Sequence, residues 1–331
     1  MKRIFIFTAI LLITAFACFY LWGSGGAMSA KDHFAKVTFH NNYEQESLDT
    51  FTVVTFNIGY LSGMTNNLPV TRSEGLFGDN LKKSLSLFKQ LDADLIGFQE
   101  IDFGSSRSKG YNQLDSLAKG LNYPVAYRSV NWDKHYVPFP YWPISSHFGR
   151  ILSGQAILSK YKLEPVETIT LEKPVNASFM YNSFYLDRLV QVAKVKLGNH
   201  EVVVMNLHLE AFDEETRVLQ AQKVKSLFEQ YAEEGPVLII GDFNSENPIQ
   251  SPNDAMRIIM ESKHMANAMD FIDYQDNKLA FNTFPSNQPA KMIDYILYNS
   301  NYIRRISSRV VRESGEISDH LPVIMKFTFS Q

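Results

Sequence analysis

The stretch PVLIIGDFN, residues 236–244, is a short apolar run that ends in a carboxylate and an amide. Bounded, β-branched runs of this length are typical of strands buried in an α/β sheet. Side chains two residues apart on an extended chain share a face, so Asp242 and Asn244 can point to the same side. The stretch therefore predicts a polar site at the end of a buried strand.

Further apolar runs carry polar residues at or near one end. They are FTVVTFN (51–57), DLIGFQE (94–100), EVVVMNLHL (201–209), MIDYILY (292–298) and LPVIMKF (321–327). Their polar residues are Asn57, Glu100, Asn206, His208, Asp294, Asp319 and His320. Ligands gather at strand ends in α/β sheets because loops there hold polar groups over a rigid base. We therefore expect these residues to meet in one site.

Segments between these runs have apolar residues at helical spacing. DEETRVLQAQKVKSLFEQY (213–231) predicts a helix capped by Asp213, and NLKKSLSLFKQL (80–91) predicts another with Asp79 as its cap. No Gly/Ser linker and no repeat interrupts residues 51–331. The sequence therefore predicts one α/β domain over 51–331, preceded by a polar linker at 31–50.

The segment NWDKHYVPFPYWPISSHFGR, residues 131–150, departs from this pattern. Its prolines and aromatic residues predict a long loop, which is either functional or a rigid aromatic flap over the core. If functional, its aromatic rings could stack on nucleic-acid bases or enter a lipid interface. His135 and His147 are interpreted as loop residues.

The first thirty residues form a separate segment. Lys2 and Arg3 precede an uncharged apolar run at 4–22, and this length favours an uncleaved membrane anchor. Two alternatives stay open: cleavage within GSGGAMSA (23–30), and lipid attachment at Cys18. The basic start predicts that the domain lies on the extracytoplasmic side.

Charge and cysteine content exclude some classes of function. The chain has 32 basic and 35 acidic residues, and without Lys2 and Arg3 the exported part carries a net charge of −5. This balance argues against tight binding of duplex nucleic acid. Cys18 is the only cysteine, so the domain has neither a disulfide framework nor thiol catalysis. Nothing in the sequence indicates an obligate protein partner.

The polar residues at the strand ends suit phosphoester hydrolysis. Oxygen ligands without clustered histidines or cysteines favour Mg²⁺, with Mn²⁺ or Ca²⁺ as alternatives, over zinc. His208 and His320 titrate near neutrality and suit proton transfer. A metal ion, a carboxylate that activates water and a proton donor are the groups that this reaction needs.

Seven short motifs occur in a fixed order between about residues 51 and 327. They are TFNIGY, IGFQEID, SGQAILS, MNLHLEA, IIGDFNS, MIDYIL and SDHLPV. In this order they resemble the endonuclease/exonuclease/phosphatase superfamily, which includes deoxyribonuclease I, abasic-site exonucleases and neutral sphingomyelinases. The resemblance implies a deoxyribonuclease I-like fold: a four-layer α/β sandwich of two packed mixed β-sheets flanked by helices.

The resemblance also implies roles for the residues in these motifs. Glu100 would be the principal metal ligand, with Asn57 and Asp319 completing the metal site. His208 would contact the phosphate or act as an acid or base. Asp319 and His320 can serve different partners because neighbouring side chains can point in different directions.

The remaining motif residues would complete the catalytic set. Asp242 would orient or deprotonate the attacking water, and Asn244 would contact the phosphate. Asp294 would pair with His320 and hold its tautomer. Outside the motifs, Arg188 and Arg150 are candidates for a clamp on a phosphate oxygen.

The sequence therefore predicts a divalent-metal-dependent phosphoesterase that acts outside the cytoplasm on a phosphodiester. Nucleic acid and phospholipid head groups both stay open as substrates. The alternative is a catalytically inactive binding module on the same fold. That alternative expects a substitution among the central residues Glu100, His208, Asp242 and His320, and none is substituted.

Overall fold

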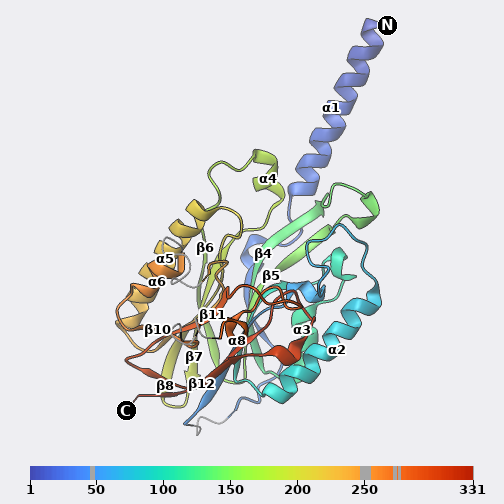
Figure 1. Ribbon diagram of the computed structural model, residues 1–331. Helices are drawn as coiled ribbons and strands as arrows, with labels where there is room; N and C mark the ends of the chain where they lie inside the picture. The colour runs from blue at the N-terminus through green and yellow to red at the C-terminus, as the bar shows by residue number, and fades with distance from the viewer. Residues whose placement is uncertain (45–48, 247–254, 271–273, 275–276, 331) are drawn as a thin grey trace.

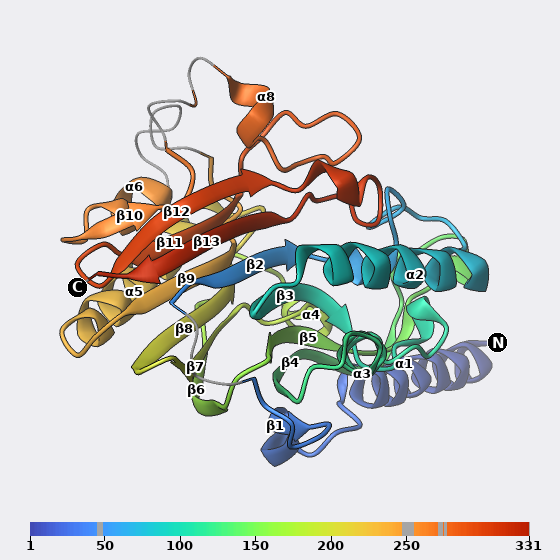
Figure 2. The same ribbon diagram turned by 90° about the horizontal axis from the view of Figure 1, so that it is seen from below.

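A computed structural model describes residues 1–44, 49–246, 255–270, 274 and 277–330. Two β-sheets pack face to face within it (Figures 1 and 2). The seven-stranded sheet has the order β1 (Phe34–Thr38), β4 (Val125–Val137), β5 (Gly149–Ser159), β3 (Leu95–Asp102), β2 (Phe51–Asn57), β13 (Val323–Phe329), β12 (Ile303–Val310). The six-stranded sheet has the order β10 (Met265–Asn267), β11 (Asp294–Asn299), β9 (Val237–Asp242), β8 (His200–His208), β7 (Leu189–Leu197), β6 (Leu163–Thr170).

Both sheets are mixed, because one pair of strands in each is parallel. The parallel pairs are β2 with β3 and β8 with β9, and the other pairings are antiparallel. The polar ends of these four strands are thereby brought to the same end of the two sheets. This arrangement produces the meeting of strand ends that the sequence predicts.

Helices cover the outer faces of the two sheets (Figure 2). They are α2 (Glu74–Leu91), α3 (Gln113–Leu121), α5 (Glu214–Ala232) and α6 (Ala255–Met260). The short helices α4 (Phe179–Phe184) and α8 (Lys278–Phe281) lie in the β6–β7 and β10–β11 connections. Phe88 of α2 and Leu117 of α3 belong to the same hydrophobic cluster as Phe98 of β3. Phe228 of α5 belongs to the cluster that contains the buried residues of the six-stranded sheet. The four-layer sandwich is therefore confirmed.

Some boundaries differ from those that the sequence predicts. Helix α2 begins at Glu74, six residues earlier than predicted. Its N-cap is Ser73, whose side chain accepts the backbone N–H of Leu76, so Asp79 is not the cap. β4 continues to Val137, so the irregular loop spans only 138–148. Within the predicted linker, β1 pairs with β4 at the edge of the sheet.

The chain begins with α1 (Lys2–Ser24), which projects away from the two sheets (Figure 1). Its mean hydropathy reaches 2.5 and the apolar part is not buried, so the helix is long and apolar enough to cross a membrane. A signal sequence and an anchor both have these properties. Cys18 is exposed on this helix.

Candidate active site

Three candidate residues lie in register across adjacent strands of the six-stranded sheet. Asp242 at the end of β9 is paired with His208 of β8 on one side and with Asp294 of β11 on the other. All three side chains are buried. Gly241 precedes Asp242 because a Cβ there would meet the carbonyl oxygen of Leu207 at 2.1 Å, so only glycine fits between β8 and β11.

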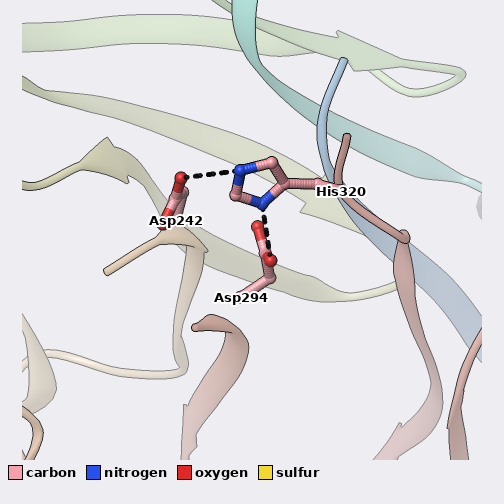
Figure 3. A group of neighbouring side chains, drawn as sticks. All are labelled: Asp242, Asp294 and His320. Carbon is pink, nitrogen blue, oxygen red and sulfur yellow. Dashed lines mark hydrogen bonds and ion pairs between the residues drawn. The ribbon is translucent and has the colours of Figure 1, made fainter. Parts of the chain in front are cut away.

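His320 lies between the carboxylates of Asp242 and Asp294 (Figure 3). Its Nδ1 is 2.9 Å from Oδ2 of Asp294, and its Nε2 is 3.7 Å from Oδ2 of Asp242. The Ser318 hydroxyl accepts the backbone N–H of His320 and donates to the carbonyl of Asn57, which joins this loop to the end of β2. The loop thus carries the imidazole from one sheet to the carboxylates of the other.

Burial and charge set the protonation of this pair. Burial raises the pKa of Asp242 to about 7, and the negative charge of Asp294 adds to the rise. Although burial acts to lower it, the pKa of His320 is raised well above its ordinary value because Asp294 and Asp242 face its two nitrogens. At neutral pH, Asp242 can accept a proton and His320 holds one.

Two amides support Asp242. Asn57 donates from Nδ2 to Oδ2 of Asp242 over 2.9 Å, and its Oδ1 accepts the backbone N–H of Gly59. Asn244 donates its backbone N–H to Oδ1 of Asp242 over 2.9 Å, and its side chain binds the carbonyl of Leu209. Asn57 therefore connects the two sheets beneath the site, and both oxygens of Asp242 are held.

Glu100 and Asp319 form a second acidic group. Asn66 donates from Nδ2 to Oε2 of Glu100 over 2.9 Å and to the oxygens of Asp319 over 3.2 and 3.3 Å. Glu100 lies where the pairing of β3 and β5 shifts register, with a φ of 51°, so a β-bulge turns its side chain toward the site. Burial and the neighbouring Asp319 raise the pKa of Glu100.

Asp319 and His320, adjacent in the sequence, therefore serve different partners. Asp319 accepts from Asn66 beside Glu100, whereas His320 faces Asp294. This is the division that the sequence predicts.

Two groups of side chains could hold a cation. Asp242, Asp294 and His320 offer ligand atoms within 4.8 Å of one another, and Oδ1 of Asp294 is buried without a hydrogen-bond partner among the described residues. Glu100 and Asp319 share a single amide donor, so a cation that replaced this contact would meet two carboxylates. Both groups supply the hard oxygen ligands that divalent cations prefer.

Arg188 extends from the start of β7 into the same region. It is buried beside Glu210, with its Nε 3.5 Å from Oε2 of Glu210 and its Nη2 3.3 Å from the hydroxyl of Tyr185. Its Nη1 is buried and has no hydrogen-bond partner in the part of the chain that the structure describes. Burial and the positive charge of Arg188 hold the pKa of His208 well below its ordinary value, so His208 is neutral at pH 7.

These groups line a cavity of about 740 Å³. The sequence-predicted residues on its surface are Glu100, Arg188, His208, Asp242, Asn244, Asp319 and His320. Asn57 and Asp294 lie beneath this surface and hold Asp242 and His320. Arg150 is exposed, binds the carbonyl of Gly104 and lies outside the cavity.

Other residues at the site carry no signal in their local sequence. Asn66 lies in the loop after β2, and Tyr185 lies in the loop before Arg188. Tyr60, which lines the cavity, is different because it ends the TFNIGY motif. Asn66 reaches Glu100 and Asp319 only because the fold brings these loops together. Glu210 lies within the MNLHLEA motif, where its position beside His208 was a signal that could have identified it.

Comparisons with known proteins agree with this fold. A sequence model of the Endonuclease/Exonuclease/phosphatase family matches residues 54–320. No curated protein matches the chain.

Three solved structures illustrate the structural likeness. An endonuclease/exonuclease/phosphatase from Beutenbergia cavernae has a TM-score of 0.59 and 17% identity, over 86% of this chain and 72% of that one. A mannosyl-6-phosphatase from Bacteroides thetaiotaomicron has a TM-score of 0.57 and 18% identity, over 84% and 100%. D. rerio TDP2, in complex with a single-strand DNA product, has a TM-score of 0.57 and 14% identity, over 85% and 100%.

These identities show a shared fold and leave the substrate open, since one of the proteins is a mannosyl-6-phosphatase and another was solved with a single-strand DNA product. The family match spans both sheets and includes Asn57, Glu100, His208, Asp242, Asn244, Asp294, Asp319 and His320. The chain therefore belongs to the Endonuclease/Exonuclease/phosphatase family.

Proposed function

We propose that this chain is a divalent-metal-dependent hydrolase of phosphodiesters that acts on the extracytoplasmic side of a membrane. The observation that carries the proposal is the Asp242–His320–Asp294 group at the floor of the cavity, within the same pocket as a buried guanidinium nitrogen without a partner. A phosphate oxygen would satisfy that nitrogen.

The residues divide the work of hydrolysis. Asp242, with a pKa near 7, takes a proton from the attacking water while the water oxygen forms a bond to phosphorus. The ester P–O bond breaks, and protonated His320 gives its proton to the leaving oxygen. Asp294 keeps the proton of His320 on Nδ1 and orients the ring.

Three further groups bind the phosphate. Arg188 donates from Nη1, neutral His208 forms a hydrogen bond, and Asn244 contacts a phosphate oxygen from the rim of the floor. These contacts place the phosphate above the floor, against Asp242 and His320. The phosphate is thereby positioned for displacement of the ester oxygen by water.

Glu100 and Asp319 would hold Mg²⁺, since both line the cavity where a phosphate can reach a shared ion, whereas Asp294 lies beneath it. Asn57 would support this site through its link to Asp242. When bound, the cation supplies positive charge against the negative charge that develops on the phosphate oxygens.

The test is hydrolysis of bis(p-nitrophenyl) phosphate by the purified full chain with Mg²⁺. We expect turnover that excess EDTA abolishes and Mg²⁺ restores. Arg188→Ala should raise KM about tenfold or more through the lost phosphate contact, whereas Arg150→Ala, its matched control, should not. Substrate binding without hydrolysis would instead favour an inactive binding module.

The location is tested separately. Lys2 and Arg3 should retain the start of α1 in the cytoplasm. A C-terminal reporter that works only outside the cytoplasm should therefore be active, and one that works only in the cytoplasm should be inactive. A fusion that is active only in the cytoplasm would reverse this topology.

A further inference from the structure

The end of α1 is held against the domain by aromatic side chains. Trp22 stacks on His135, with ring centroids 5.8 Å apart and planes 8° apart. Tyr20 packs edge-on against Phe184, and Phe19 packs edge-on against Tyr136. These partners belong to β4 and α4, so the helix is joined to the two elements on either side of its end.

Polar contacts fix the segment that follows α1. The carbonyl of Gly25 accepts the backbone N–H of His135 over 2.8 Å. The backbone N–H groups of Ala27 and Met28 donate to the buried carboxylate of Asp133 over 3.0 and 2.7 Å. The segment that could contain a signal cleavage site is therefore part of the folded domain, which favours a retained helix with a fixed direction.

Large apolar side chains are exposed around this end of the molecule. Tyr141, Trp142 and Ile144 lie in the loop between β4 and β5. Val175 lies in the segment before α4, and Phe179 is the first residue of α4. Their exposed fractions are 82%, 77%, 63%, 87% and 72%, in the same order. We call these five residues the apolar rim. Figure 1 shows α4 and the β4–β5 loop at the end of the domain from which α1 projects.

The cavity lies between the same two segments. Phe139, Tyr141 and Phe148 line one wall, and Met180 and Phe184 line the other. Since α1 would place a bilayer beside both segments, the two apolar walls of the cavity would lie next to the bilayer surface. Trp and Tyr favour the interface of a membrane, and exposed apolar side chains of this kind insert at its boundary.

The lack of charged residues in the two wall segments favours a lipid over a nucleic acid as the ligand. Residues 138–148 and 175–184 contain no Lys, Arg, Asp or Glu. A protein that follows a nucleic-acid backbone needs cationic side chains along its groove, because each phosphate must be neutralised. The other cations that line the cavity, Arg217 and Lys291, lie outside these two segments. Uncharged apolar walls above buried Arg188 instead fit one phosphate attached to an apolar body.

We propose that the substrate is a membrane lipid with a phosphoester in its head group, which enters the cavity directly from the bilayer through the apolar rim. The apolar walls hold the part of the lipid next to its head group, and the floor hydrolyses the P–O ester bond with water as described above. This proposal rests on the proposed phosphoesterase function and adds the class of its substrate.

The first experiment measures the depth of Trp142 without depending on catalysis. The full chain is reconstituted into vesicles of phosphatidylethanolamine, phosphatidylglycerol and sphingomyelin, with and without lipids brominated along their chains. The fluorescence of Trp142→Phe is subtracted to isolate Trp142 from Trp22 and Trp132. We expect the brominated lipids to quench Trp142, and no quenching would overturn the membrane placement.

The second experiment compares substrates in the same vesicles with Mg²⁺. The rim variant Trp142→Ser/Ile144→Ser should lower lipid hydrolysis about tenfold, because less apolar surface is inserted, and should change bis(p-nitrophenyl) phosphate hydrolysis by less than about twofold. The control Tyr302→Ser/Ile306→Ser removes two exposed apolar residues near β12, away from α1, and should change neither rate.

The outcomes separate the two proposals. Hydrolysis of the soluble diester without hydrolysis of any vesicle lipid overturns the lipid substrate and leaves the phosphoesterase standing. The lipid substrate is also overturned if single-stranded or duplex DNA is hydrolysed faster than any vesicle lipid, at the same rate in the rim variant as in the unsubstituted chain. If nothing is hydrolysed, the phosphoesterase proposal and the lipid substrate fail together, and Trp142 quenching still decides the placement.

Discussion

The floor of the cavity comes from the ends of buried strands, whereas its walls come from a loop and a short helix. On the floor, Asp242, His208 and Asp294 are fixed by sheet register, and each contacts a defined partner. Along the walls, Phe139, Tyr141 and Met180 are exposed, and the two segments that carry the wall residues contain no Lys, Arg, Asp or Glu. In the proposed function, the floor would determine the reaction through the identity of its residues, and the walls would determine the substrate class through their apolar composition.

The largest effect should follow substitution on the floor. We expect His320→Ala to lower kcat about 10³-fold with both soluble and lipid substrates, since the proton donor is lost. Thermal unfolding measured in parallel should show an intact fold. A variant that lost activity toward lipid alone would break the division between floor and walls.

Removal of the metal should have nearly as large an effect on every substrate. Excess EDTA should abolish hydrolysis, and Glu100→Gln should raise the Mg²⁺ concentration for half-maximal activity about tenfold or more because one carboxylate ligand becomes neutral. Asp294→Asn serves as the comparison and should leave this concentration unchanged. The reverse result would place the ion at Asp242, Asp294 and His320 instead.

Asp294→Asn should lower kcat about 10²-fold through the orientation of His320. Its carboxylate raises the pKa of His320, so the variant should have a lower pKa there. His320 would then lose its proton at a lower pH, and the alkaline limb of the pH–rate profile should move to lower pH. Near-normal turnover with an unmoved limb would contradict the pairing.

The smallest effect should come from the contact of α1 with the domain. A Cβ at Gly26 would lie 2.6 Å from Oδ2 of Asp133, so Gly26→Ala should loosen the segment and lower lipid hydrolysis about threefold. Soluble diester hydrolysis should not change. Gly75→Ala is the matched control, since its Cβ would meet its nearest atom at 3.9 Å. Faster proteolysis between α1 and β1 in Gly26→Ala, but not in Gly75→Ala, would support the proposal that this segment holds α1 in a fixed direction.

Much of the fold and floor was predictable because an apolar run followed by a polar residue marks a strand end. The family motifs then supplied partners such as Asp294 and His320, whose hydrogen bond the structure contains. Asn66 escaped prediction since it reaches Glu100 across a loop, without any periodicity to mark it. Arg150 was a candidate because an arginine can clamp a phosphate oxygen, but sequence alone does not give the direction of a side chain.

The irregular segment shows another limit. Aromatic and proline residues at 131–150 predicted a loop throughout, yet pairing with β5 extends β4 to Val137. Tertiary pairing overrides local composition there. The exposed Trp142 and Ile144 remain in the part that is irregular.

The register of β8, β9 and β11 has a consequence for folding. A slip of a single residue between these strands would turn His208, Asp242 and Asp294 to opposite faces, so no partly paired sheet can assemble the floor. Loss of turnover on heating should then coincide with unfolding of the six-stranded sheet. Enzyme assays would therefore report directly on cooperative unfolding.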